Sequence, residues 1–312
     1  MGGDGKAGIT GNENRPRQTC LVVGAHRPLG GQIALALRSY GYRVLATHRT
    51  PSNQWHDRLS RAGIDQCALD LTDSAAVAKV GQQADIAVLT PILTVSAPAV
   101  PILVASGILR GVVFSSNNVA VVGPDPVYDK LRAAEARLQA DAPDWAILRP
   151  TMIYGFPGDG NLSNLMRLAR RLPVFPRLGL GRAKQQPIHT EDLARVAAGL
   201  AVQRWTAAGI IPVGGPDVLS HRQMVSLARR AADAPGWIIP VPTALARIVR
   251  VSLSRVGVTL PLSEAQLARI DLDKAAIDAR PIPDELKPRI SLESGLAALA
   301  ADMRRAPLEQ AD

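Results

Sequence analysis

The sequence predicts an α/β protein built on a doubly wound parallel sheet, with a smaller, mainly helical C-terminal domain. Two observations lead to this fold class. Residues 19–50 read as strand, glycine turn, helix and strand, which is the opening unit of a Rossmann-type dinucleotide-binding fold. Apolar runs of strand length then alternate with helical patterns up to about residue 155, as repeated βαβ units require.

The opening unit is predicted from local signals. The apolar run Cys20–Val23 is short enough for a buried strand, and Gly24 begins a tight turn. Pro28 suits a first helical position because its φ is fixed and it has no N–H to satisfy. Gly41 ends the helix, and residues 42–47 form the second strand. A dinucleotide pyrophosphate would lie at the helix N-terminus, where unpaired N–H groups favour an anion.

The glycine turn departs from the ideal pattern. Gly24 and Gly30 match the first and last positions of Gly-x-x-Gly-x-x-Gly, but Arg27 occupies the middle position. Arg27 either meets a cofactor phosphate or faces solvent on a degraded motif. We expect Gly24, Arg27, Leu29 and Gly30 to contact the cofactor.

The end of the second strand indicates which cofactor binds. NAD sites usually carry a carboxylate there for the ribose 2′-hydroxyl, whereas NADP sites carry an arginine. The strand ends in Thr47-His48-Arg49, without a carboxylate. Arg49 either binds a 2′-phosphate or is a loop cation, and we favour NADP(H) over NAD(H).

Later strands are expected at residues 66–69, 84–90, 111–115 and 145–148, and their carboxyl ends should line the ligand crevice. Asp70, with Leu71 beside it, is expected to accept a hydrogen bond from the adenine amino group. Alternatively Thr72 or Asp73 caps the next helix, and both can hold together. Thr90 would lie beside the cofactor ribose. Ser116 and Asn117 line the crevice or serve turn chemistry.

The chain divides into three regions by pattern. Residues 1–18 are expected to be a disordered tail, 19–155 the NAD(P)-binding domain and 156–312 the substrate domain, with 186–213 returning to the first sheet. Gly- and Pro-rich loops begin at residue 156, which marks the change.

Composition narrows the class of protein. The 312 residues are 47% hydrophobic, enough for a large core, and carry a net charge of +9. The arginines are spread over helices and not interleaved with aromatics, so nucleic acid is not an expected partner. The five histidines show no metal-ligand spacing. No signal peptide or membrane-spanning run is visible, so we expect a soluble cytoplasmic protein.

Taken together, these residues resemble the extended short-chain dehydrogenase/reductases of the NAD-dependent epimerase/dehydratase family. The resemblance is strongest to the atypical branch that includes the 39-kDa-type subunit of respiratory complex I. It covers residues 19 to about 303. The segments that carry it are the glycine turn, Asp70-Leu71, Val113-Phe114-Ser115-Ser116, Lys130 with Glu135, Leu148 through Gly155, Gln186 through Ala194, and Val213-Gly214-Gly215-Pro216.

The family uses a Tyr-x-x-x-Lys pair and a serine for proton transfer beside the nicotinamide. Lys130 matches the lysine, but Pro126 stands where the tyrosine belongs. Tyr128 lies two residues before Lys130, and residues two apart lie on different faces of a helix. The two side chains can therefore meet only if the segment is not yet helical at Tyr128. Ser116 is the nearest match to the serine, with Asn117 as its alternative. The resemblance therefore implies Lys130, Tyr128 and Ser116 as catalytic residues, and Lys130 as a cofactor contact.

Two functions follow from this resemblance. The first is an NADP(H)-dependent oxidoreductase or epimerase-like enzyme that uses hydride transfer, and the second is a non-catalytic NADP(H)-binding protein. Asn117, Arg149, Tyr154 and His189 are the substrate-site candidates, although Arg149 can instead anchor the fold and His189 can satisfy a turn. A nucleotide sugar and a lipophilic quinone or isoprenoid-like substrate both stay open, as does a homodimer.

Overall fold

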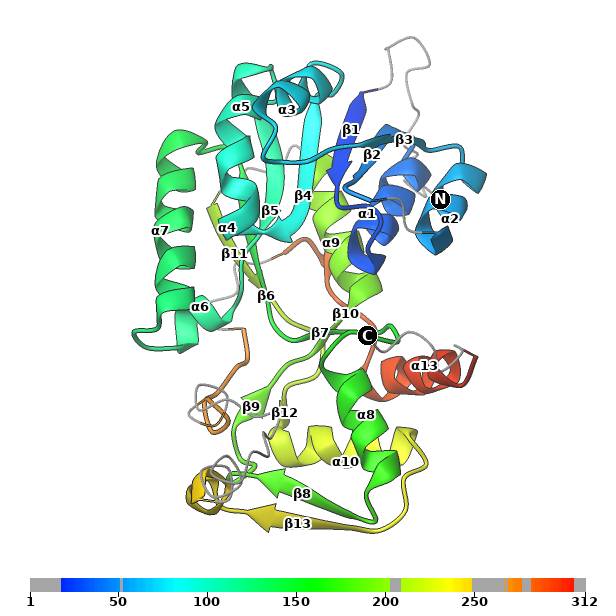
Figure 1. The fold of residues 1–312 in the computed structure, drawn as a ribbon, viewed down its shortest axis with the longest axis vertical. Helices are drawn as coiled ribbons and strands as arrows, with labels where there is room; N and C mark the ends of the chain where they lie inside the picture. Colours follow the sequence, from blue (N-terminus) through cyan, green and yellow to red (C-terminus); the bar gives the residue numbers. More distant parts are fainter. Residues whose placement is uncertain are drawn as a thin grey trace, which may run out of the picture.

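The computed structural model of the chain describes residues 18–50, 53–202, 209–248, 267, 269–276 and 282–305. The predicted tail therefore lies outside the described residues, except for Gln18. The molecule has an upper part built on a large sheet and a lower part of helices and short strands (Figure 1).

The upper part is organised by a seven-stranded parallel sheet with the order β11-β6-β5-β4-β1-β2-β3. The strands are β1 (Thr19–Val23), β2 (Arg43–His48), β3 (Asp65–Ala68), β4 (Ile86–Ile92), β5 (Arg110–Phe114), β6 (Ala146–Pro150) and β11 (Gly209–Val213). The order reverses between β1 and β4, which is the switch point where ligands bind in open α/β sheets. The predicted doubly wound fold class is confirmed.

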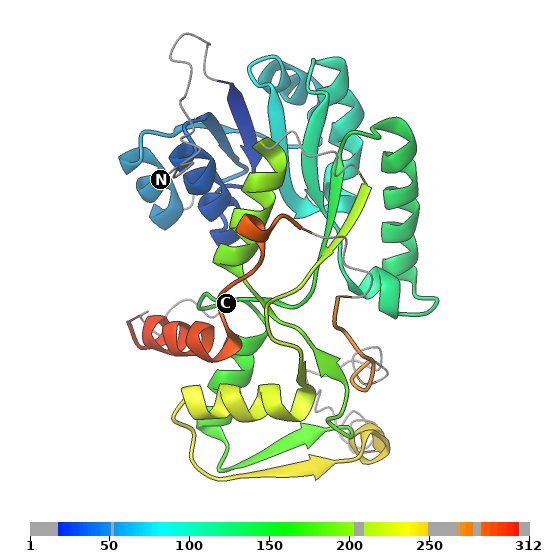
Figure 2. The same cartoon turned by 180° about the vertical axis from the view of Figure 1, so that it is seen from behind.

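Helices cover both faces of this sheet. Against one face lie α1 (Pro28–Ser39), α2 (Asn53–Arg61) and α9 (Thr190–Val202), and from behind α9 is seen lying across the sheet beside α1 (Figure 2). The other face is covered by α3 (Ser74–Gly81), α4 (Leu93–Ser96), the 3-10 turn η1 (Ala97–Ala99), α5 (Val100–Ala105) and α7 (Pro126–Asp141).

Strand β1 shows why both faces need cover. Cys20 and Val22 pack into the core under α1 and α9, whereas Leu21 and Val23 pack into the core under α3 and α5. All four are almost fully buried, so the strand reads as a continuous apolar run. Such a run suits a parallel strand between two helical layers.

The lower part is mixed, not purely helical. Its helices are α8 (Leu162–Arg171), α10 (His221–Ala231) and α13 (Leu292–Arg305), and its strand pairs are β7 (Ile153–Tyr154) with β10 (Ile188–His189), β9 (Lys184–Gln185) with β12 (Leu219–Ser220), and β8 (Val174–Leu178) with β13 (Trp237–Val241). The sequence reading missed β8 and β13. Pro176 and Pro240 lie within them, and proline argues against a strand unless the strand lies at an edge, as these do.

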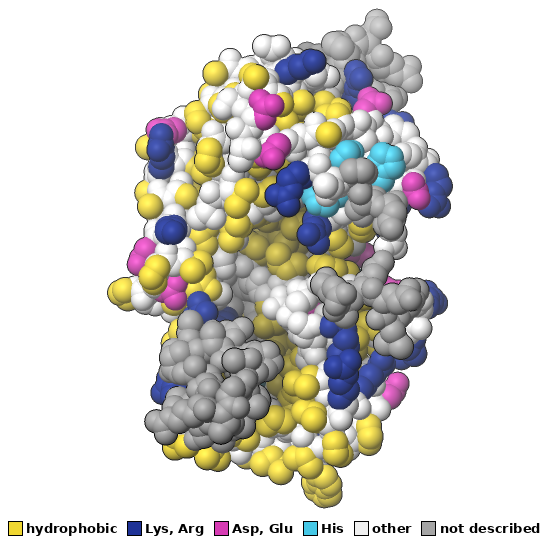
Figure 3. Space-filling model, viewed as in Figure 1, with side chains coloured by type: hydrophobic (Ala, Val, Ile, Leu, Met, Phe, Trp, Pro, Cys, Tyr) yellow, Lys and Arg dark blue, Asp and Glu magenta, His cyan; other side chains and the backbone are white. Residues whose placement is uncertain are grey.

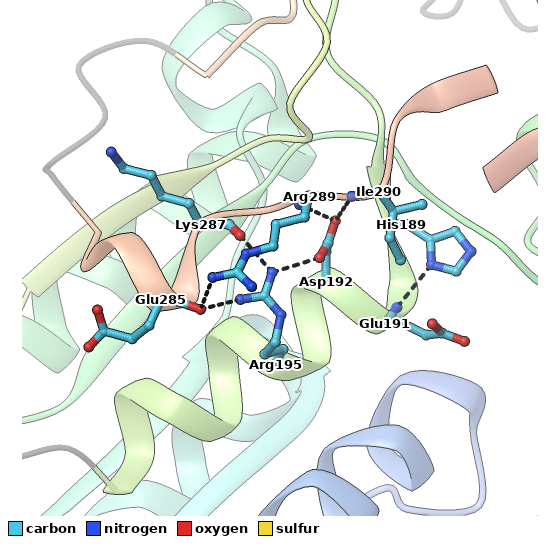
Figure 4. A network of polar contacts seen from close by, with 8 residues as sticks. All are labelled: His189, Glu191, Asp192, Arg195, Glu285, Lys287, Arg289 and Ile290. Carbon is cyan, nitrogen blue, oxygen red and sulfur yellow. Dashed lines mark hydrogen bonds and ion pairs between the residues drawn. The ribbon is translucent and has the colours of Figure 1, made fainter. Parts of the chain in front are cut away.

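A buried carboxylate fastens the C-terminal segment to α9. One oxygen of Asp192 accepts hydrogen bonds from the backbone N–H groups of Arg289 (2.8 Å) and Ile290 (2.7 Å), and the other accepts from Arg195 (2.7 Å). Arg195 also donates to the carbonyls of Glu285 and Lys287 (Figure 4). This network holds the chain just before α13, whose Gly295 packs on Tyr154 in the lower core.

Candidate functional site

The glycine turn after β1 is as tight as the sequence predicts. Gly24 has φ +84°, and an added Cβ would lie 2.4 Å from the Thr90 hydroxyl oxygen. That hydroxyl donates to the carbonyl of Val23 (2.8 Å), which fixes Thr90 against the turn. At Gly30, a Cβ would lie 2.4 Å from the carbonyl oxygen of Gly24. Both glycines are therefore needed for the backbone to pass this closely.

The N-terminus of α1 is arranged to receive an anion. Arg27 is the N-cap residue with an extended backbone, and no side chain caps the helix. Pro28 is the first helical residue, and the first helical hydrogen bond runs from Gly31 N–H to the Arg27 carbonyl (2.9 Å). The N–H groups of Leu29 and Gly30 precede that bond, and the first turn holds no acidic side chain. A phosphate group fits this arrangement.

Histidines and arginines gather beside the turn. His26 and Arg27 come from the turn, His48 and Arg49 from the end of β2, and His56 from α2. The His48 and His56 rings lie edge to face with centroids 5.8 Å apart, and Arg27, His48 and Arg49 all act electrostatically on His26. We call these five residues the His/Arg cluster. In Figure 3, histidines lie next to basic side chains above a hollow between the two parts of the molecule.

The imidazoles of the His/Arg cluster have nitrogen atoms without a hydrogen-bond partner. The Nδ1 atoms of His26, His48 and His56 are buried and have no hydrogen-bond partner. Burial, and then the charge of Arg27, lower the pKa of His26, while burial and then His56 lower the pKa of His48. Among the described residues no histidine group has the arrangement of a metal site. The cluster therefore combines the permanent charges of Arg27 and Arg49 with two imidazoles, those of His26 and His48, whose lowered pKa values delay their charging as the pH falls.

Asp70 and Leu71 lie where the sequence places them, after β3. One carboxylate oxygen of Asp70 accepts from both the backbone N–H (2.9 Å) and the hydroxyl (2.8 Å) of Thr72. These two bonds, and more weakly the charge of Arg49, lower the pKa of Asp70. Asp73 caps α3 through the N–H of Ala76 (3.0 Å). Asp70 therefore shapes its own turn, and its contact with a cofactor through the other oxygen stays a prediction.

The end of β5 brings together several of the predicted polar residues. Ser116 accepts from the N–H of Asn118 (3.3 Å), and the amide of Asn118 donates to the hydroxyl of Tyr128 (2.9 Å). Asn117 is buried, donates to the carbonyls of Lys274 and Ala275 (3.3 and 3.1 Å), and has an unpartnered side-chain oxygen. A short chain of polar contacts thus joins Ser116 to Tyr128, through the backbone N–H of Asn118 on one side and its side-chain amide on the other.

The structure does not bring Lys130 to this polar chain. Tyr128 already lies in the first turn of α7, so the irregular lead-in considered from the sequence is absent. Lys130 points elsewhere: it is exposed and lines a cavity of about 570 Å³ with Thr94 and Pro98, between α4–α5 and α7. The cation beside the tyrosine is instead Arg269, whose guanidinium lies 5.3 Å from the Tyr128 ring centre. No sequence signal joins two residues so far apart along the chain.

The remaining substrate candidates have structural partners. Arg149 makes a two-pronged ion pair with the buried carboxylate of Glu135, which supports the anchoring role. Tyr154 is fully buried, and its ring lies edge to face with His189 at 5.2 Å. His189 is also buried, and its Nδ1 accepts from the N–H of Glu191 (3.3 Å). Both side chains therefore pack in the interior in this structure, and their contact with a substrate stays a prediction.

Comparison with known sequences finds one relative over about half of the chain and no family. No family model matches the chain. A protein of Sinorhizobium fredii, the uncharacterized y4nG, is 29% identical over 164 residues. That match spans 49% of this chain and 41% of the relative's length.

Comparison with solved structures is more informative. The UDP-glucose 4-epimerase of Thermotoga maritima superposes with a TM-score of 0.67 at 14% identity, covering 92% of this chain and 99% of its own. The dTDP-glucose 4,6-dehydratase of Bacillus anthracis, solved with NAD, reaches 0.68 at 13% identity, covering 92% and 97%. MoeE5, solved with UDP-glucose and NAD, reaches 0.67 at 20%, covering 92% and 99%.

The chain has the epimerase/dehydratase fold. The predicted resemblance to extended short-chain dehydrogenases is therefore confirmed at the level of fold, in both the upper and the lower part. Among the described residues, none of the helices is long and apolar enough to cross a membrane.

Proposed function

We propose that the protein binds NADP(H) in the crevice at the carboxyl ends of β1, β2 and β4, and that it acts as an oxidoreductase or epimerase-like enzyme. The observation that carries this proposal is the uncapped N-terminus of α1 behind a tight glycine turn, with the His/Arg cluster beside it. Solved structures with the same fold hold NAD, which supports a nicotinamide cofactor here.

The preference for NADP(H) rests on charge. The end of β2 presents Arg49, with His48 before it and His26 close by, and no carboxylate for a ribose 2′-hydroxyl. A 2′-phosphate adds two negative charges at neutral pH, and the cluster offers both permanent and titratable positive charge. When bound, the nicotinamide supplies or accepts a hydride.

The residues of this chain would position a substrate and move a proton. Tyr128 is the proposed acid or base because its hydroxyl ends the chain of contacts from Ser116 through Asn118. The Arg269 guanidinium lies over the Tyr128 ring and also pairs with the Asp125 carboxylate (3.7 Å), so its positive charge beside the ring is partly balanced. A nucleotide sugar is the favoured substrate because neighbours with this fold are solved with UDP-glucose. The lipophilic substrate and the homodimer stay predictions.

The position of Lys130 favours a second candidate function. Because this lysine lies in the cavity beside α4 and not beside Tyr128, the family's Tyr-Lys pair is not formed. A protein that binds NADP(H) without turnover would need the crevice but not the pair.

The test is a titration of the full-length protein with NADPH and NADH. For wild type we expect tighter binding of NADPH, and for Arg49→Gln a loss of about tenfold to a hundredfold for NADPH alone, since a charge-assisted contact is removed. Arg43→Gln is the matched control: this arginine lies at the opposite end of β2 and pairs with Asp65 (3.0 Å). Equal affinity for both cofactors would refute the NADP preference, and binding of neither would refute the proposed function.

A further inference from the structure

The small sheet at the lower end of the molecule carries apolar side chains on both faces. β8 and β13 pair in parallel, so Val174 lies beside Trp237 and Phe175 beside Ile238. Phe175 and Ile238 pack inward against α8 and α10. The alternate side chains of the two strands point the other way, and all are apolar: Val174, Pro176, Leu178, Trp237, Ile239 and Val241. We call these six residues the outer apolar face.

The outer apolar face is largely open to solvent. Trp237 is 79% exposed, and Ile239 and Val174 are 48% and 45% exposed. Hydrophobic side chains line the lower end of the molecule, where β8 and β13 lie (Figures 1 and 3). Just after β13, Leu245 and Ile248 are also exposed. A contiguous apolar patch on a folded protein marks a surface that meets a partner.

The backbone around Trp237 is held in place. Arg229 is buried in α10 and donates to the carbonyls of Ala234 and Pro235 (3.2 and 2.6 Å). It also donates to the carbonyl of Trp237 (3.0 Å), while the N–H of Trp237 donates to the carbonyl of Pro173 (3.1 Å). The exposed indole is therefore a fixed feature of the fold.

Exposed arginines border the outer apolar face where its strands begin. Arg171 is the last residue of α8, three residues before β8, and Arg230 lies in the last turn of α10. Both are exposed. The acidic residue in the connection from α10 to β13 is Asp233, and its carboxylate lies 3.7 Å from the guanidinium of Arg304 on α13. Positive charge thus prevails along this border.

The net charge of the chain is concentrated in the same region. Residues 162–189 and 218–248, which contain α8, β8, α10 and β13, hold ten lysines and arginines and one acidic residue. The whole chain holds 36 basic and 27 acidic residues, so its remainder is balanced and the net charge of +9 belongs to this region. Asp271 and Asp273 lie beyond the other end of β8, where they accept from the N–H groups of Leu180 and Lys184 (3.0 and 2.7 Å).

We propose that the outer apolar face and its bordering arginines dock the protein on the surface of a membrane that contains anionic lipids. The Trp237 indole suits the boundary between headgroups and acyl chains, because its ring is apolar and its N–H is polar. Val174 and Ile239 would enter beside it. Arg171 and Arg230 would face the lipid phosphates.

Charge and chemistry favour this partner over others. A second copy would bring two surfaces of the same positive charge together, which opposes association. Nucleic acid is bound through polar contacts to phosphates and base edges, whereas the centre of this face is aliphatic. The proposal is independent of the proposed function, because none of these residues lies at the crevice.

The test is co-sedimentation of the full-length protein with vesicles of equal parts phosphatidylglycerol and phosphatidylcholine, without cofactor. We expect binding to these vesicles, little binding to pure phosphatidylcholine, and release at high salt. Trp237→Gln and Ile239→Gln should each weaken binding about tenfold, because each removes a large apolar side chain from the contact. Leu109→Gln is the matched control, since Leu109 is 68% exposed in the upper part.

A second pair of variants separates local charge from net charge. Arg171→Gln/Arg230→Gln should weaken vesicle binding about tenfold or more, because two cations leave the lipid surface. Arg38→Gln/Lys79→Gln removes two exposed cations from α1 and α3 in the upper part and lowers the net charge equally. This control should bind as wild type does.

Tryptophan fluorescence then shows whether the face enters the bilayer. Vesicles with brominated acyl chains should quench the wild-type emission, whereas Trp237→Phe should keep most of the binding and lose most of the quenching. Absence of vesicle binding, equal binding by all variants, or unchanged quenching in Trp237→Phe would overturn the proposal. A wild-type dimer that Trp237→Gln converts to a monomer in sedimentation velocity would also overturn it, because a second copy would then cover the face.

Discussion

Substitution of Asp192 is predicted to loosen the joint between α9 and the C-terminal segment. Asp192 is only 2% exposed and accepts from two backbone N–H groups, those of Arg289 and Ile290, and from the Arg195 guanidinium. Asp192→Ala leaves these N–H groups without their acceptor and breaks a buried ion pair, which should cost about 3–5 kcal/mol of unfolding free energy.

Asp192→Asn should be milder, for a geometric reason. The amide can turn its oxygen to the two backbone N–H groups, but its NH₂ then faces the Arg195 guanidinium, a donor facing a donor. Only the charge-assisted bond is lost, so we expect a cost of about 1.5–3 kcal/mol. Glu191→Gln, an exposed neighbour in the same helical turn, is the matched control and should stay within about 0.5 kcal/mol of wild type.

The assay is urea unfolding followed by circular dichroism, with limited proteolysis to detect release of the C-terminal segment. The expected order of stability is wild type and Glu191→Gln, then Asp192→Asn, then Asp192→Ala. An Asp192→Ala protein within about 1 kcal/mol of wild type would refute the reasoning, because the N–H groups would then have found other partners or water.

Three further predictions concern the crevice. Burial lowers the pKa of His48, so its imidazole becomes charged only at a pH below the ordinary pKa of histidine. NADPH affinity should therefore rise between pH 8 and pH 5.5 more than NADH affinity does. Fluorescence titrations measure both affinities, and His48→Asn should reduce the difference between their pH dependences. Gly24→Ala should destabilise the fold by about 1–3 kcal/mol in thermal unfolding and should weaken cofactor binding. The reason is that Gly24 has φ +84° and that an added Cβ would lie 2.4 Å from the Thr90 hydroxyl oxygen. The control is Gly123→Ala, which should be nearly neutral because an added Cβ meets open space there. Tyr128→Phe should lower turnover at least about a hundredfold while NADPH affinity stays unchanged, and retained turnover would remove Tyr128 from the proton-transfer step.

The upper part of the fold could be predicted because its signals are local. Residues close together in the sequence specify each of its first elements. These are a strand, a glycine turn with proline at the first helical position, and a helix. The same is true of the parallel strands, whose runs are apolar on both faces. The strands β8 and β13 were missed because each contains a proline, which is tolerated only at an edge that the sequence does not reveal.

The candidate site was predicted only in part. Gly24 lies against Gly30 and Thr90 because β1 and β4 are neighbours in the sheet and bring their carboxyl ends together, whereas contact of these residues with a cofactor stays a prediction. Lys130 matched a family pattern, yet a helix that begins at Pro126 turns it away from Tyr128. Residues two apart on a helix point in different directions, so Tyr128 and Lys130 are separated once both lie in the helix. Where the helix begins therefore decides whether the two side chains can meet.

By itself, the sequence determined the doubly wound class, the glycine turn and the basic end of β2, because each depends on residues that are neighbours in the chain. The tertiary structure alone decided that His26, His48 and His56 gather beside the glycine turn, and that Arg269 lies over the Tyr128 ring. These contacts join segments far apart in the chain, and only the packing of the two parts brings them together.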